Sequence, residues 1–95
     1  MKSIRPLFVY PAIVASSIFA GSVLAGPDCT SEPVEKWKDQ DTFKEELKAQ
    51  GYSWKVFKVT SGNCYEIYGW NSEGKKVEIY FDPITGEKVK EEVKG

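Results

Sequence analysis

Apolar and polar residues alternate most regularly in two segments of the second half of the 95-residue chain. In residues 64–70 and again in residues 76–81, apolar side chains recur at every second position, as in a β-strand with one buried face. Residues 52–60 are rich in aromatic and β-branched side chains but do not alternate cleanly. The pattern therefore predicts three strands, with a bulge near Val56 that lets both parities of the first strand contribute to the core.

Turn-forming residues separate these strands and predict an antiparallel meander. Residues 61–63 and 71–74 contain Gly, Asn and Ser, and residues 82–86 contain Pro and Gly, which suit tight turns. Val89 can begin a short fourth strand, and residues 91–95 are predicted to form a tail. The sheet is therefore expected to have three or four strands.

The parity of the side chains sets the register of the second and third strands. A slip of one position would place Ile67 beside Glu78 and bury a charge, so odd residues must oppose odd residues. Gly69 would then leave room for a large neighbour. The predicted core face comprises Tyr65, Ile67, Val77, Ile79 and Phe81.

One helix is predicted before the strands, from a cap at Asp39 to about residue 50. Phe43 and Leu47 are four residues apart and share one face, whereas the residues around them are charged. Gly51 suits the left-handed position that ends a helix. Because so short a helix needs packing to be stable, the sequence predicts an α+β domain with this helix on the antiparallel sheet.

The first 25 residues have the layout of a secretory signal peptide. Two basic residues precede an apolar run over residues 7–20 and a small-residue stretch over residues 21–25. Val23 and Ala25 fit the small-residue rule, so we predict cleavage after Ala25 and a periplasmic or secreted protein without a stable membrane anchor. The alternative is an uncleaved anchor, although the interrupted run is barely long enough to span a bilayer.

Cleavage would leave a chain of about 70 residues, near the lower limit for a core that supports itself. The two cysteines of the chain, Cys29 and Cys64, would enter an oxidising compartment, where a disulfide is expected. Free thiols or metal ligation are the alternatives, but two cysteines without histidine are too few soft ligands for zinc. The disulfide would tie an extended arm, residues 26–38, to a domain of residues 39–90.

Charge and composition narrow the classes of function. From residue 26 onward, 11 Lys stand against 14 Asp plus Glu, with no Arg or His, which gives a formal charge of −3. The interspersed signs disfavour nucleic acid and anionic membranes as partners. The usual general base is missing, because the chain has no His. We therefore predict a protein that is not an enzyme and that needs no cofactor or metal.

The face of the sheet opposite the core carries the residues that the fold does not require. Glu66 and Glu78 are expected to lie diagonally on it, and such a pair can perform acid–base chemistry. The interpretation we favour is that both carboxylates face solvent and are offset by lysines, and acid–base chemistry is the alternative. Aromatic residues are numerous for so short a chain, and an exposed aromatic patch would mark a binding surface. The candidate partner-binding surface comprises Trp54, Glu66, Tyr68, Trp70, Glu78 and Tyr80.

Two motifs give the chain a resemblance to a known family. Residues 64–69 read Cys-Tyr-Glu-Ile-Tyr-Gly, and residues 77–86 read Val-Glu-Ile-Tyr-Phe-Asp-Pro-Ile-Thr-Gly. Together they resemble a PepSY domain, which was described in propeptides of secreted metallopeptidases and in small exported bacterial proteins. The resemblance covers essentially all of the predicted mature chain, and it implies a helix packed on an antiparallel sheet. The Cys29 and Cys64 pair resembles that of some small periplasmic members.

The resemblance implies a protein-binding module that modulates or inhibits peptidases, and it brings no catalytic residue with it. The expected partner is then a protein outside the cytoplasm, such as a peptidase. The alternative from another class is a periplasmic accessory protein that binds a small ligand or a metal. The lack of His in the chain argues against soft metals in that role.

Overall fold

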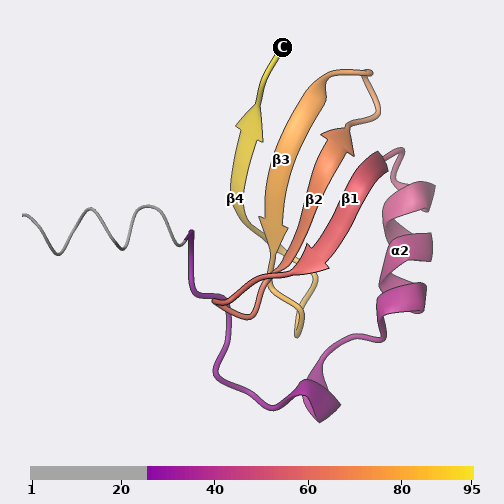
Figure 1. Ribbon diagram of the computed structural model, residues 1–95. Helices are drawn as coiled ribbons and strands as arrows, with labels where there is room; N and C mark the ends of the chain where they lie inside the picture. The colour runs from indigo at the N-terminus through magenta and orange to yellow at the C-terminus, as the bar shows by residue number, and fades with distance from the viewer. Residues whose placement is uncertain (1–25) are drawn as a thin grey trace, which may run out of the picture.

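The computed structural model describes residues 26–95, so the predicted signal peptide lies outside the described residues. The strands form one antiparallel sheet in the order β1-β2-β3-β4, and helix α2 packs against one side of it (Figure 1). The predicted α+β fold is confirmed. The elements are a 3₁₀ turn η2 (Val34–Lys36), α2 (Gln40–Ala49), β1 (Ser53–Val59), β2 (Tyr65–Trp70), β3 (Lys76–Phe81) and β4 (Lys88–Val93).

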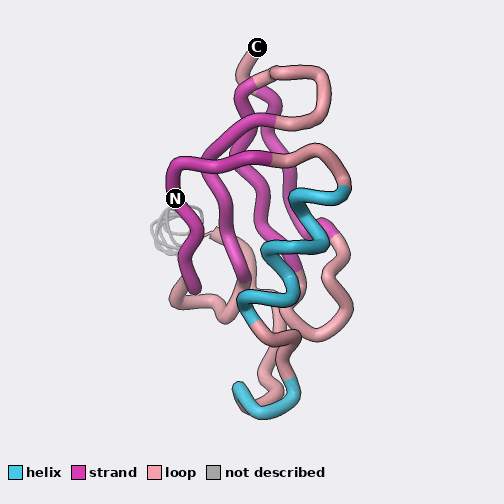
Figure 2. The backbone as a smooth tube through the Cα atoms, turned by 90° about the vertical axis from the view of Figure 1, so that its right-hand side faces the viewer, coloured by secondary structure: helices cyan, strands magenta, loops and turns pink. Residues whose placement is uncertain are grey.

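Helix α2 begins and ends at the residues that its sequence indicates. The Asp39 carboxylate accepts a hydrogen bond of 3.0 Å from the backbone N–H of Thr42, as an N-cap does. Gly51 follows the helix with φ of +96°, a left-handed conformation that suits glycine. The buried residues of the helix are Phe43 and Leu47, and the helix lies across the sheet on that side (Figure 2). Packing of these two side chains therefore holds the short helix in place.

The register of β2 and β3 is the one that parity predicts. Ile67 pairs with Ile79, Tyr65 with Phe81, and Gly69 with Val77. The apolar sets of both strands consequently face α2 and form one core. The buried core comprises Phe43, Leu47, Tyr65, Ile67, Val77, Ile79 and Phe81.

A bulge in β1 is confirmed between Trp54 and Val56, where the register with β2 shifts by one residue. Trp54 and Phe57 both pack against the core as a result, although they differ in parity. Gly69 lies opposite Trp54, and a Cβ at Gly69 would collide with the Ser53 carbonyl oxygen and lie 2.5 Å from Trp54 Cα. The glycine therefore admits the close backbone approach that the bulge requires.

The last strand is longer than predicted. Residues 91–95 were expected to form a tail, but β4 pairs with β3 as far as Val93, which lies opposite Val77. The prediction fails because β4 is exposed along its whole length and shows no apolar alternation. Backbone hydrogen bonds to β3 hold β4 at the edge of the sheet. Its charged side chains are typical of edge strands, where they discourage pairing with another chain. Only residues 94 and 95 follow the strand.

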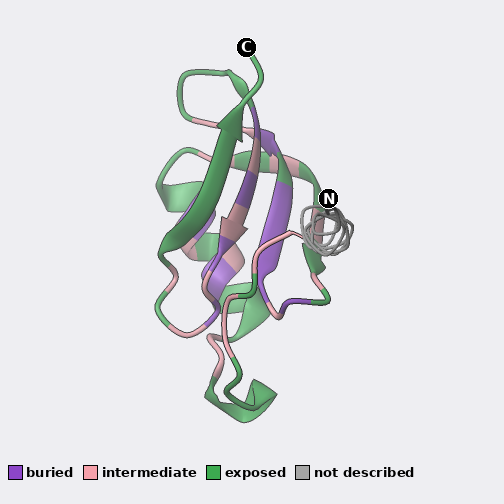
Figure 3. Ribbon diagram, turned by 90° about the vertical axis from the view of Figure 1, so that its left-hand side faces the viewer, coloured by how far each residue is buried: buried purple, intermediate pink, exposed green. Residues whose placement is uncertain are grey.

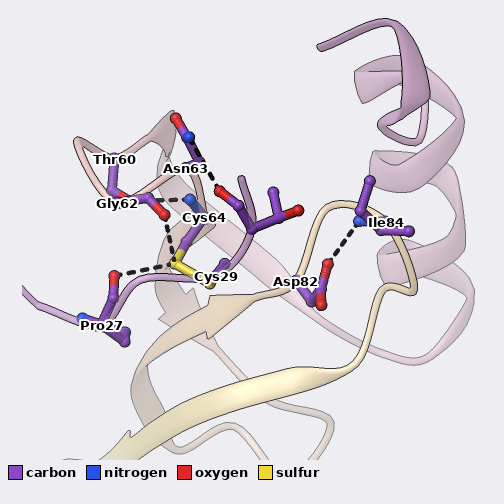
Figure 4. Close-up of a disulfide and its surroundings, with 9 residues drawn as sticks. Pro27, Cys29, Thr60, Gly62, Asn63, Cys64, Asp82 and Ile84 are labelled. Atoms are coloured by element: carbon purple, nitrogen blue, oxygen red, sulfur yellow. Dashed lines mark hydrogen bonds between the residues drawn. A yellow bond between two sulfur atoms is a disulfide. The ribbon is translucent and has the colours of Figure 1, made fainter. Parts of the chain in front are cut away.

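The N-terminal arm passes below the β1–β2 turn and is fastened there. A disulfide joins Cys29 to Cys64, as predicted, and the Cys29 N–H donates to the Gly62 carbonyl at 2.8 Å (Figure 4). The side-chain amide of Asn63 donates to the Thr30 carbonyl at 3.1 Å. Within residues 26–95, no helix is both long and apolar enough to cross a membrane.

Candidate functional site

The side of the sheet that faces away from α2 is the candidate site, and we call it the open face (Figure 3). Strand pairing places side chains from all four strands on it, because residues directly opposite each other point to the same side. The arm reaches only one end of this face, near the β1–β2 turn. The open face comprises Val56, Lys58, Glu66, Tyr68, Trp70, Lys76, Glu78, Tyr80, Lys90, Glu92 and Lys94.

Two carboxyl groups and two tyrosines form a cluster at the centre of the open face. Glu66 lies opposite Tyr80, and Tyr68 lies opposite Glu78, so the two glutamates are diagonal neighbours, as predicted. The Tyr80 hydroxyl donates to Glu78 Oε2 at 3.1 Å. Glu66 is only 2% exposed, so the expectation that it faces solvent is wrong. It is covered because β1, β3 and their long side chains flank its strand on both sides.

The pKa values of the two carboxyl groups are shifted in opposite directions. Burial raises the pKa of Glu66, and its hydrogen bond with Glu78 raises it further. Burial also works to raise the pKa of Glu78, but hydrogen bonds from Glu66, Tyr68 and Tyr80 outweigh it and hold that pKa below its ordinary value. As a carboxylate, Glu66 would leave Oε2 buried without a donor among the described residues. A proton would therefore be held more firmly by Glu66 than by Glu78, and on Glu66 it would provide a donor beside the Glu78 carboxylate.

Tyrosines and lysines surround this pair. Hydrogen bonding with Glu78, together with burial, raises the pKa of Tyr68 to about 12. Burial and the neighbouring Glu66 raise the pKa of Tyr80. Lys58 Nζ lies 3.8 Å from Glu66 Oε1, and Lys94 Nζ lies 3.6 Å from Glu78 Oε1. Both tyrosines therefore remain hydroxyl donors at neutral pH, and the cluster can bind a positively charged or hydrogen-bonding group.

Replacing Glu66 with glutamine should flatten the pH dependence of stability in the uncleaved full chain. The folded-state pKa of Glu66 is raised above 4.5, so its stabilising contribution is complete below pH 4.5 and is lost as the pH rises. Wild-type protein should lose up to about 1.4 kcal/mol of unfolding free energy per pH unit in that window. Glu66→Gln keeps a donor toward Glu78 and should show no such slope. Urea unfolding between pH 4.5 and 8 measures it.

The matched control is Glu73→Gln, which removes an exposed carboxylate in the β2–β3 turn. It should retain the wild-type slope. A wild-type slope in Glu66→Gln would show that Glu66 holds no extra proton in the folded protein.

An aromatic hollow lies next to the cluster on the open face. Val56 and Tyr68 are paired across β1 and β2, and each is 40% exposed. With Trp70 they border a cavity of about 320 Å³, whose rim carries lysines. An apolar floor with a cationic rim suits an apolar group that carries or adjoins a carboxylate. The cavity is lined by Lys55, Val56, Tyr68, Gly69, Trp70, Lys76, Val77 and Lys94.

Five of the six residues of the predicted partner-binding surface lie together on the open face, and the sixth lies on the opposite side of the sheet. Glu66, Tyr68, Trp70, Glu78 and Tyr80 share the open face. Trp54 lies on the other side, packed against the core, because the bulge at residue 55 turns it toward α2. Sequence reasoning missed the open-face position of Val56 and the lysine rim. Once the bulge is placed after Trp54, parity assigns Val56 and Lys58 to the open face.

Metal chemistry has no evident ligand set in residues 26–95. No group of three or more His, Cys, Asp or Glu side chains converges there. The cluster offers two carboxyl groups beside two tyrosines, and the Tyr80 hydroxyl donates to Glu78. Such an arrangement can hold an ammonium group or accept hydrogen bonds from a partner.

Fold and site together describe a small α+β module. One helix covers one face of a four-stranded meander, and the other face presents polar, aromatic and charged side chains. The chain belongs to the PepSY_2 family, described as peptidase propeptide and YPEB domain, which matches residues 10–92. The resemblance drawn from the two motifs is thereby confirmed. No curated protein and no solved structure matches the chain.

Membership of this family supports a module of the peptidase-propeptide or inhibitor type. Domains of this family are not known as catalytic domains.

Proposed function

We propose that the protein is an exported, non-enzymatic module that binds a peptidase through the open face and restrains its activity. The observation that carries the proposal is the exposure of Val56 and Tyr68, side by side on the one face that the fold leaves uncovered. Exposed apolar groups that border a hollow are typical of binding surfaces. The family supports a peptidase as the partner.

The open face also suggests which partner segment would fit. Lys55, Lys76 and Lys94 rim the aromatic hollow, and Lys58 Nζ lies 5.6 Å from the centre of the Tyr68 ring. A segment with an apolar side chain beside one or two carboxylates would fill the floor and pair with the rim. We infer that such an extended acidic segment of the peptidase, near its substrate cleft, is the element that binds.

Export rests on two features of the chain. The leader-like residues 1–25 favour secretion, and the disulfide suits an oxidising compartment. Both features support a protein that meets its partner outside the cytoplasm.

The proposal predicts that Val56→Glu loses inhibition. Initial rates of purified exported metallo-, serine and cysteine peptidases on a fluorogenic peptide, measured against increasing protein, should fall for at least one class. Glutamate at position 56 would place a charge on the apolar floor, so the inhibition constant should rise at least about tenfold. The matched control is Val34→Glu, because Val34 is 67% exposed but lies in η2, away from the open face.

Unchanged rates for all three classes would sink peptidase inhibition as the function. Equal inhibition by Val56→Glu, Val34→Glu and wild type would keep inhibition but remove the open face from it. Melting temperatures of the three proteins should agree within a few degrees, so that loss of inhibition reports binding rather than folding.

A small-ligand role is the second candidate, because the hollow of about 320 Å³ has the volume of a small-molecule site. Its lysine rim would select an apolar carboxylate. A rise in melting temperature with aryl or short-chain carboxylates, lost in Val56→Glu, would favour this role over a protein partner.

A further inference from the structure

A second hollow on the open face lies between the carboxyl cluster and the β1–β2 turn. Its volume is about 340 Å³, and Glu66 and Tyr80 form one of its walls. The opposite wall is the end of β1 and the turn that follows it. The hollow is lined by Lys58, Val59, Thr60, Ser61, Glu66, Tyr68 and Tyr80.

The hollow contains a buried acceptor that lacks a donor. Glu66 Oε2 is inaccessible to solvent and accepts no hydrogen bond from any described residue. Lys58 approaches the other oxygen, Oε1, at 3.8 Å, and half of its side chain is exposed. A buried carboxyl oxygen without a donor is costly. A cation bound at this oxygen would relieve that cost.

The N-terminal arm passes beside Tyr80, one of the residues that line this hollow. Gly26 packs against the Tyr80 side chain, since a Cβ built on Gly26 would be 3.3 Å from the Tyr80 hydroxyl oxygen. That hydroxyl in turn lies 3.1 Å from Glu78 Oε2. Gly26 has φ of +78°, so it reaches this position in a conformation that favours glycine. Residue 26 is therefore in contact with a member of the carboxyl cluster.

Covalent and hydrogen bonds fix the arm in this position. The disulfide ties Cys29 to Cys64, and the Cys29 N–H donates to the Gly62 carbonyl. A Cβ at Gly62 would collide with the Pro27 carbonyl oxygen, so glycine there lets the arm pack directly on the turn. Only two residues separate Gly26 from Cys29 of the disulfide, which leaves the arm little freedom to move away.

We propose that this hollow is an ammonium site and that its occupant is the α-amino group of the chain itself, freed at Gly26 when the signal peptide is removed. The proposal rests on the predicted cleavage after Ala25, and it goes beyond the peptidase-binding role. The charged groups that face the site are Lys58 from β1, Glu66 from β2, Glu78 from β3, Lys90 and Glu92 from β4, and Lys94, which follows β4.

Processing would then change the open face. In the uncleaved chain, residue 26 contributes a neutral peptide nitrogen, which brings no positive charge to the two glutamates. After cleavage, the ammonium group would pair with both carboxylates and hold the arm against Tyr80. The arm would close the hollow beside the β1–β2 turn, and the aromatic hollow at Val56 would remain free for a partner.

The test compares free and blocked α-amino groups in the exported protein. Protein recovered from the periplasm should have an intact mass that begins at Gly26. One portion is acetylated selectively at its α-amino group while unfolded and is then refolded with the disulfide intact. Acetylation should lower the melting temperature of wild-type protein by about 4–8 °C, the shift expected when one charged contact is lost from a domain of this size.

The control is the Glu66→Gln/Glu78→Gln double variant, in which the cluster holds no carboxylate. Acetylation should change its melting temperature by less than about 2 °C, because the ammonium group then has no partner in the hollow. The double variant keeps hydrogen-bonding side chains of the same size, so it should fold. The comparison therefore separates pairing in the hollow from any general effect of blocking the terminus.

Three results would overturn the proposal. The first is a mature mass that does not begin at Gly26. The second is a loss on acetylation that is equal in wild type and in the double variant, or absent from both. The third is a rise in the melting temperature of the unacetylated wild-type protein on addition of glycinamide, since that would show the ammonium site to be empty.

Discussion

Replacing Cys29 and Cys64 together with alanine should lower the free energy of unfolding by about 3–4 kcal/mol, the chain-entropy value for a loop of this length. The two cysteines are 35 residues apart in sequence, and Cys64 is fully buried. Since each kcal/mol corresponds to about 4–8 °C in a domain of this size, the melting temperature should fall by at least about 12 °C. Thermal unfolding followed by circular dichroism measures it.

Wild-type protein treated with a reductant is the control for the cavity that alanine would introduce. It should lose nearly as much stability as the double variant, because both lack the cross-link but only the variant lacks the sulfur atoms. A melting temperature within about 3 °C of wild type for both would show that the arm does not depend on the disulfide for its place.

Phe43→Ala should lower the free energy of unfolding by about 3–5 kcal/mol, as truncation of a buried phenylalanine does. Phe43 is one of the two buried residues through which α2 packs against the sheet. Its ring centre lies 5.4 Å from that of Tyr65, 5.2 Å from that of Phe81 and 6.3 Å from that of Phe57. Because so small a domain has only about 5–15 kcal/mol of stability, chemical denaturation should show a large drop in midpoint.

Glu45→Ala is the matched control on the same helix. Glu45 is exposed and points away from the core, so its replacement should change stability by less than about 0.5 kcal/mol. If Phe43→Ala were equally mild, the helix would contribute little to the fold, contrary to the core described above.

The core and the strand register were predictable because they depend on the period of the side chains alone. A buried face allows one register, so Ile67 and Ile79 could be paired without any knowledge of the structure. The bulge was predictable for a related reason, since Trp54 and Phe57 differ in parity and both are too apolar to leave outside. Glycine and proline then marked the turns between the strands.

The burial of Glu66, the length of β4 and the position of Trp54 could not be predicted. Each depends on which neighbouring elements cover the residue, and the sequence of one strand does not contain that information. Glu66 is charged in the sequence and was expected to be solvated, but β1 and β3 bury it from both sides. Strand β4 has no apolar period, because its place at the edge depends on backbone pairing rather than on burial. Trp54 was predicted on the open face but packs against the core on the α2 side. The position of the bulge decides between these two faces, and side-chain parity located the bulge only to within a residue or two.

The two faces of the sheet carry different sets of aromatic and charged residues. Aromatic rings on the side of α2 form the core, while Tyr68, Trp70 and Tyr80 lie on the open face with the carboxyl pair. This division is the physical basis of the proposed function, because it leaves one face without a structural partner.

Lysine footprinting of the complex with the inhibited peptidase would show which face of the protein binds. The chain carries lysines on both faces, so acetylation of each lysine reports whether its own face is covered. We expect binding to slow acetylation on the open face and to leave Lys44 and Lys48 of α2 unchanged. Protection of the two helix lysines, with no change on the open face, would contradict it. The lysines expected to be protected are Lys55, Lys58, Lys76 and Lys94.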